Sequence, residues 1–109
     1  MGGKTAVNAS LLGKIRAFKS AVAKKYGVEK IVLFGSQATG KATAESDVDL
    51  MLVSKKFEGQ SSLKRPVPFY LEWSYDQPAD FVCYTPAEFA RLSKKATLVK
   101  WALENGIIA

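Results

Sequence analysis

The chain of 109 residues has no histidine and a single cysteine, Cys83. Without histidine, the usual serine and cysteine triads and all His-ligated metal sites are excluded. One cysteine cannot form an internal disulfide or a cysteine-type zinc site. Because Cys83 alternates with Val82 in an apolar stretch, we expect it to be a buried packing residue.

Long hydrophobic runs are also absent. No apolar run approaches the ~20 residues of a membrane span, and the start at Met1 lacks the apolar core of a signal peptide. We therefore expect no membrane association and a cytoplasmic protein. The length predicts one domain over residues 1–109, and a hydrophobic fraction of 48% is enough for one core.

Positive charge is in excess over negative charge. Lysine and arginine number 16 against 10 acidic residues, which gives a net charge of +6. This balance favours anionic partners such as nucleotides, nucleic acid or an acidic protein, although solubility alone would also explain it. The basic residues are scattered singly or in pairs, which weakens a purely nucleic-acid-binding interpretation without excluding nucleic acid. A chain this small is expected to share a large ligand with another protein or with a second copy in a homodimer.

The order of the predicted elements indicates an α/β (α+β) fold, in which helices pack on a small mixed sheet. Apolar spacing predicts a first helix over residues 10–26, with Ser10 as its N-cap and Gly27 just beyond its end. Strands are expected over 30–34, from 47 or 48 to 53, and over 79–84. Further helices are expected over 69–73 (after Pro68), from Thr85 to about 94, and over 97–104 before Gly106.

One interpretation of residues 34–52 is a phosphate-binding P-loop. Gly35, Gly40 and Lys41 satisfy the pattern G-x-x-x-x-G-K after a strand. That pattern then requires serine or threonine and a long helix. Position 42 is Ala42, and the chain returns to a strand within a few residues, so the P-loop interpretation is disfavoured.

The second interpretation starts from two carboxylates, Asp47 and Asp49. Side chains alternate along a strand, so both carboxylates would point to one side. Like charges side by side repel unless a cation lies between them, and magnesium prefers such oxygen ligands. The alternative is that Asp47 belongs to a turn and Asp49 faces solvent.

A glycine-serine pair strengthens the metal interpretation. Gly35 and Ser36 end the first strand, and ten residues separate Ser36 from Asp47. A glycine lets backbone approach a phosphate closely, and a serine hydroxyl with nearby N–H groups can hold its oxygens. If the two strands are neighbours, this turn and the carboxylates meet at one edge, as a nucleoside triphosphate with magnesium requires.

The sequence FGSQATG followed by SDVDL resembles the minimal nucleotidyltransferases of the DNA polymerase β superfamily, most sharply over residues 31–53. The resemblance implies a polymerase β palm-like fold. It also implies a third carboxylate on a later strand, for which Asp80 is the only good match. Asp47, Asp49 and Asp80 would then be catalytic residues and metal ligands. The alternative for Asp80 is a turn residue after Pro78.

One position departs from the family pattern. Many minimal members carry arginine before the second glycine, where this chain has Thr39. The resemblance implies that Gly35 and Ser36 contact the triphosphate, and Lys41 is the nearest substitute for the missing guanidinium. An ammonium is less well oriented toward phosphate than a guanidinium.

The function that the resemblance implies is transfer of a nucleoside monophosphate, AMP from ATP or another nucleotide, with Mg²⁺ or Mn²⁺. The acceptor would be a hydroxyl of a partner protein, and chains of this length resemble the antitoxin of HEPN/MNT toxin–antitoxin pairs. Two alternatives remain open at this point. One is a non-catalytic module that binds nucleotide and partner; the other is transfer to RNA or to a small molecule.

The aromatic residues have two interpretations. Phe69, Tyr70, Trp73 and Tyr75 follow Lys64-Arg65 and could form a base-stacking surface. Helix-on-sheet packing is the favoured interpretation for them. Trp101, in an amphipathic stretch, is expected in the core or at a dimer contact.

Overall fold

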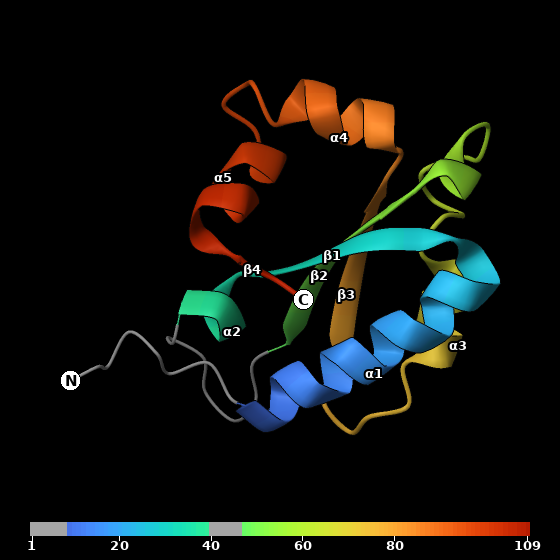
Figure 1. The fold of residues 1–109 in the computed structure, drawn as a ribbon, viewed down its shortest axis with the longest axis vertical. Helices are drawn as coiled ribbons and strands as arrows, with labels where there is room; N and C mark the ends of the chain where they lie inside the picture. Colours follow the sequence, from blue (N-terminus) through green and yellow to red (C-terminus); the bar gives the residue numbers. More distant parts are fainter. Residues whose placement is uncertain (1–8, 40–46) are drawn as a thin grey trace.

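The computed structural model describes residues 9–39 and 47–109, which form four strands and several helices (Figure 1). In chain order the elements are α1 (Ala9–Tyr26), β1 (Val28–Phe34), α2 (Ser36–Thr39), β2 (Val48–Ser54), the 3₁₀ turn η2 (Lys55–Phe57), α3 (Val67–Glu72), β3 (Ala79–Tyr84), α4 (Pro86–Leu92), α5 (Leu98–Asn105) and β4 (Ile107–Ile108). No helix in these two ranges is both long and apolar enough to span a membrane.

The sheet has the order β3-β2-β1-β4. Strand β1 runs antiparallel to both β2 and β4, whereas β2 and β3 run parallel. A parallel pair needs a crossover connection, and the segment that contains α3 supplies it. The mixed sheet with helices on it confirms the predicted fold class.

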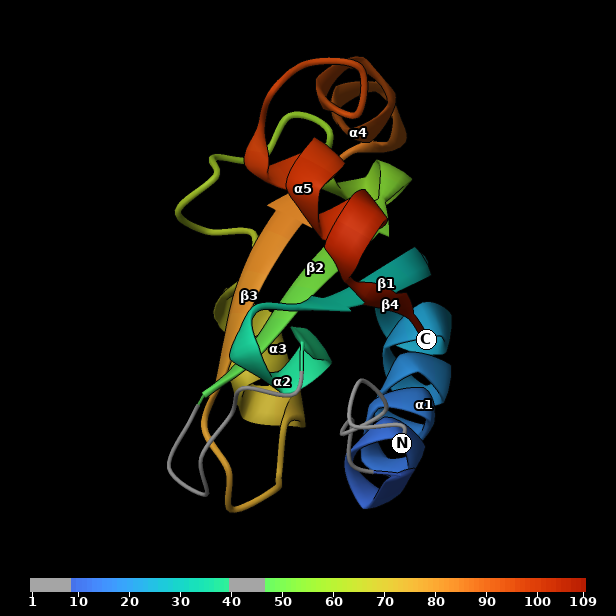
Figure 2. The ribbon, with the colours of Figure 1, turned by 90° about the vertical axis from the view of Figure 1, so that its left-hand side faces the viewer.

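Helices cover both faces of the sheet (Figures 1 and 2). On one face, Ile15 of α1 and Phe69 of α3 join a buried cluster with Leu50 of β2. On the other face, Phe89 of α4 and Val99 of α5 join a second buried cluster with Met51. Because both faces are buried, β1 and β2 each contain a continuous apolar run, over residues 31–34 and 50–53, rather than an alternating pattern.

The helix boundaries follow the predicted capping signals with one exception. Gly27, at φ 64°, follows the last residue of α1. Thr85 and Glu88 form a full capping box at the start of α4. The Ser10 N-cap prediction was wrong, because α1 begins at Ala9 and Ser10 lies within it. Serine is tolerated in a first helical turn, so its presence does not fix the boundary.

Other differences concern short elements. Helix α3 begins at Val67 rather than after Pro68, since proline is tolerated in a first turn where its missing N–H has no partner. The single turn α2 and the two-residue strand β4 were not predicted, because neither is long enough to show periodicity. Trp101 is 43% exposed, so the core interpretation was wrong and a surface position remains.

Candidate functional site

Two carboxylates lie side by side where the parallel strands β2 and β3 begin. Asp49 and Asp80 are partners in the register of this pair. Val48 and Leu50 are buried under α1 and α3, so the side chain of Asp49 points to the opposite face. Asp80 is exposed and Asp49 is half-buried, while Asp47 is exposed immediately before β2. The structure therefore brings Asp49 and Asp80 together at the start of the β2–β3 pair and leaves Asp47 exposed one residue before β2.

The electrostatics of this group centre on Asp49. Burial raises the pKa of Asp49 above its usual value of 3.8, and the negative charges of Asp80 and then Asp47 raise it further. Each of these causes disfavours the charged form of the carboxyl group. A cation bound beside these carboxylates would oppose that repulsion and favour the charged form of Asp49.

The turn after β1 touches the same carboxylate. Phe34, the last residue of β1, is paired with Asp49 of β2. The next residue, Gly35, has φ 77°, and a Cβ at this position would overlap Oδ2 of Asp49. Glycine is therefore required here by the backbone conformation and by the space that the carboxylate occupies.

The residues after Gly35 form the single turn α2. The backbone N–H groups of Ala38 and Thr39 donate to the carbonyl oxygen of Gly35 at 3.1 and 3.2 Å. The Thr39 hydroxyl lies 3.4 Å from the carbonyl oxygens of both Gly35 and Ser36. Thr39, which replaces the arginine that many family members have here, therefore directs its hydroxyl toward the backbone of its own loop. Lys41, its predicted substitute, lies outside the described residues.

The carboxylate oxygens of these aspartates are the kind of ligand that a hard divalent cation prefers. Magnesium is commonly bound by one or two carboxylates and completes its shell with substrate phosphates and water. Asp49 and Asp80, adjacent in register, provide such a pair. Within residues 9–39 and 47–109, no three acidic, histidine or cysteine side chains lie close enough together to hold a metal ion.

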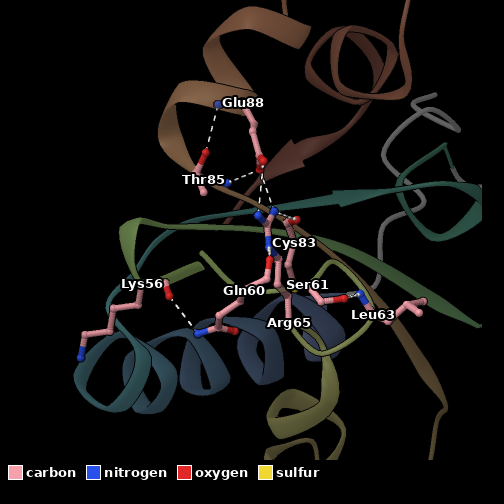
Figure 3. Close-up of polar contacts among 8 residues, drawn as sticks. All are labelled: Lys56, Gln60, Ser61, Leu63, Arg65, Cys83, Thr85 and Glu88. Atoms are coloured by element: carbon pink, nitrogen blue, oxygen red, sulfur yellow. Dashed lines mark hydrogen bonds and ion pairs between the residues drawn. The ribbon is translucent and has the colours of Figure 1, made fainter. Parts of the chain in front are cut away.

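The structure also distinguishes between the alternative roles of the residues around the site. A P-loop is excluded, because α2 ends at Thr39 and β2 begins at Val48, which leaves no room for its long helix. Phe69 and Trp73 are buried, which confirms the packing interpretation for them. Arg65 is also buried and binds Glu88, so it does not serve a base-stacking surface (Figure 3).

Two features of this region were not found from the sequence. Gln37 is buried within α2, although the small polar composition of residues 35–46 gave no signal for a buried amide. The contact of Gly35 with Asp49 joins residues 14 positions apart in sequence. A strand prediction places both elements but does not give their mutual register.

Comparison with known proteins identifies the family of the chain. A family model described as a nucleotidyltransferase domain matches residues 15–107. Two proteins of Methanocaldococcus jannaschii, each named "putative protein adenylyltransferase", are 47% identical over 38 residues and 46% identical over 41 residues. These matches cover 35% and 36% of this chain, and 38% and 41% of the two relatives.

A solved structure shows the same fold over nearly the whole chain. The crystal structure of a protein from Sulfolobus solfataricus, named a "putative nucleotidyltransferase", superposes with a TM-score of 0.67. The match covers 99% of this chain and 86% of the other, at 16% identity. At that identity the likeness concerns the fold alone.

Proposed function

Because the chain belongs to the nucleotidyltransferase domain family, we propose that it transfers a nucleoside monophosphate from a nucleoside triphosphate to an acceptor hydroxyl. One observation carries this proposal. Asp49 lies beside Asp80 in register and against the backbone of Gly35, so a carboxylate pair and a glycine turn share one place. That combination suits a magnesium–triphosphate complex better than it suits a structural turn.

Each site residue has a role in the proposal. Asp47, Asp49 and Asp80 hold Mg²⁺, or Mn²⁺ in its place, and the bound cation would neutralise developing charge on the phosphates. Gly35 and Ser36 contact the β- and γ-phosphates, with Lys41 as a further cation near them. The protein contributes mainly position and charge, which are the principal terms in phosphoryl chemistry.

The proposed reaction is an in-line displacement. The oxygen of the acceptor hydroxyl forms a bond to the α-phosphorus, and the bond from that phosphorus to the bridging oxygen of the β-phosphate breaks. Pyrophosphate leaves with the bonding electron pair. Asp80, the most accessible strand carboxylate of the group, accepts the hydroxyl proton directly or through water.

We propose ATP as the donor and a hydroxyl of a partner protein as the acceptor. The naming of the two Methanocaldococcus relatives as protein adenylyltransferases supports this choice. The proposed partner is a helical HEPN-type toxin, with this chain as the antitoxin of the pair.

A non-catalytic module that binds nucleotide and partner is the second candidate. Thr39 favours it, because its hydroxyl faces the loop backbone where a guanidinium would grip phosphate. The presence of all three carboxylates opposes it, since a pure binding module would not need them together.

One experiment separates the two candidates. The chain and its Asp47→Asn/Asp49→Asn variant are incubated with Mg²⁺, α-labelled ATP and an extract of the source organism. The proposal predicts a labelled protein with the parent chain and none with the variant. Asp76→Asn, which changes an exposed carboxylate outside the site, serves as the control and should label as the parent does. Absence of label with folded parent protein would favour the binding module, and labelled RNA or a small molecule would replace the proposed acceptor.

A further inference from the structure

The helix α3 and the turn before it are apolar on the outside as well as on the inside. Helical hydrogen bonding begins early, because the N–H groups of Lys64 and Arg65 both donate to the carbonyl oxygen of Ser61. Arg65, Phe69 and Trp73, spaced four residues apart, form the buried side. The opposite side carries large apolar residues, here named the outer strip: Leu63, Val67, Tyr70 and Leu71.

The outer strip is open to solvent in the described part of the chain. Leu63 and Leu71 are each 84% exposed, and Val67 is 54% exposed. Val67 and Leu71 lie four residues apart on one side of α3, and Leu63 lies in the turn before this helix. A helix that is apolar all round is normally buried on all sides, and contiguous exposed apolar patches mark interaction sites.

The segment that presents the outer strip is firmly anchored (Figure 3). The guanidinium of Arg65 donates to both carboxylate oxygens of Glu88, at 2.7 and 3.3 Å, and to the carbonyl oxygen of Cys83 at 3.3 Å. Its Nε donates to the carbonyl oxygen of Gln60 at 3.1 Å. Leu63, two residues before Arg65, is thus held on an ordered loop, which lowers the entropy cost of binding a partner.

The outer strip adjoins the strand that carries Asp80. The ring of Tyr70 packs edge-on against that of Phe81, with centroids 4.9 Å apart. Phe81 follows Asp80 on β3, which is an end strand of the sheet. Neighbouring side chains of a strand point to opposite faces, so Phe81 faces α3 while Asp80 lies on the other face. A protein seated on the outer strip would therefore reach the carboxylates around the β3 edge of the sheet.

Charge around the outer strip indicates the kind of partner. The segment from Lys55 to Lys64 carries three lysines and one acid, Glu58. Glu72, at the end of α3, is already bound by Lys25 at 3.0 Å and Tyr26 at 3.1 Å. A second copy of this chain, also at +6, would meet electrostatic repulsion, whereas an acidic partner would be attracted.

From these observations we infer that the outer strip is the docking surface for the acceptor protein, which binds it through an apolar face flanked by acidic residues. This inference rests on the proposed function, because it places the acceptor of the transfer reaction. It assigns acceptor recognition to residues that lie between Asp49 and Asp80 in the sequence.

The test uses the full chain and two matched double variants. Leu63→Ser/Leu71→Ser alters the outer strip, and Leu98→Ser/Ile108→Ser alters two exposed apolar residues elsewhere. Labelling of the acceptor protein from α-labelled ATP is measured at limiting extract, and binding of Mg–ATP to each purified variant is measured separately. We expect the outer-strip variant to label the acceptor about tenfold more slowly while binding Mg–ATP as the parent does. The control variant should match the parent in both measurements.

The outcomes separate this inference from the proposed function. If the parent chain labels the acceptor and the outer-strip variant labels it equally fast, the docking site is overturned and the proposed function stands. No labelling by the parent would overturn both. If the parent chain sediments as a dimer and the outer-strip variant as a monomer, the surface belongs to a second copy and the acceptor assignment is overturned. Label found only on RNA would do the same.

Discussion

The backbone of Gly35 lies directly against the carboxylate of Asp49, in a space where no side-chain carbon fits. This relationship joins the turn that ends β1 to the first part of β2. It also brings the two halves of the sequence motif into contact, although they are 14 positions apart in sequence.

Substitution of Gly35 by alanine should abolish nucleotidyl transfer. The new Cβ would displace the Asp49 carboxylate, and φ 77° would also strain any residue other than glycine. We expect a rate at least about a hundredfold lower, similar to the loss of one key charge-stabilising group. Gly59→Ala is a matched control, since Gly59 has φ 79° but open space around it. Equal loss in both variants would show that backbone strain, and not the Asp49 contact, is responsible.

Neutralising Asp49 should make the fold more stable while removing activity. Burial and the charges of Asp80 and Asp47 raise its pKa, so the ionised form is disfavoured in the folded chain. Asp49→Asn removes like-charge repulsion across the β2–β3 pair, which should raise the free energy of unfolding by about 0.5–1 kcal/mol. Urea unfolding at pH 7 in the absence of Mg²⁺ measures this. A fall in stability would mean that the carboxylate serves the fold instead of the reaction.

The end of α5 should be intolerant of any side chain at position 106. A Cβ on Gly106 would lie 2.5 Å from the carbonyl oxygens of both Ala102 and Leu33. Gly106→Ala should therefore lower the free energy of unfolding by about 1–3 kcal/mol, the usual range for overpacking. Gly13→Ala is the control, because Gly13 lies in α1 with open space and alanine favours helix by up to about 1 kcal/mol. Thermal unfolding that ranks the two variants in the reverse order would contradict this account of α5.

The ion pair of Arg65 and Glu88 should make stability depend on acid pH. The hydrogen bond from Arg65, followed by that from the Thr85 backbone, lowers the pKa of Glu88 below its usual 4.5. A lowered pKa means that the stabilisation is present above pH 4.5 and is lost as the pH falls through the folded-state value. Glu88→Gln should lower the free energy of unfolding by about 1–3 kcal/mol at pH 7 and flatten its fall below pH 4.5. An unchanged acid slope in the variant would show that other carboxyls govern it.

The parts of the fold that could be predicted are those with strong local signals. Thr85-Pro86 with Glu88 fixes the start of α4, and apolar runs fix the three longer strands. Elements α2 and β4 could not be predicted because one turn or two residues carry no periodicity. The outer strip was not predicted either, since Leu63, Val67 and Leu71 are apolar residues that a sequence pattern places in a core.

The candidate site divides in the same way. The spacing of Asp47 and Asp49 predicts a shared side only if both residues lie on a strand, and in the structure β2 begins between them at Val48. The position of Asp80 beside Asp49 depends on the register of β2 with β3, which is a tertiary property. Burial of Arg65 depends likewise on its distant partner Glu88, 23 residues away.

The most direct test of the central claim compares ATP labelled on the α-phosphate with ATP labelled on the γ-phosphate. The parent chain, Asp80→Asn and Asp76→Asn are each incubated with Mg²⁺ and extract of the source organism. The account predicts label on an acceptor protein from α-labelled ATP only, with the parent and Asp76→Asn, and a loss of about a hundredfold or more in Asp80→Asn. Label from the γ-phosphate, or α-label transferred equally well by Asp80→Asn, would contradict nucleotidyl transfer at these carboxylates.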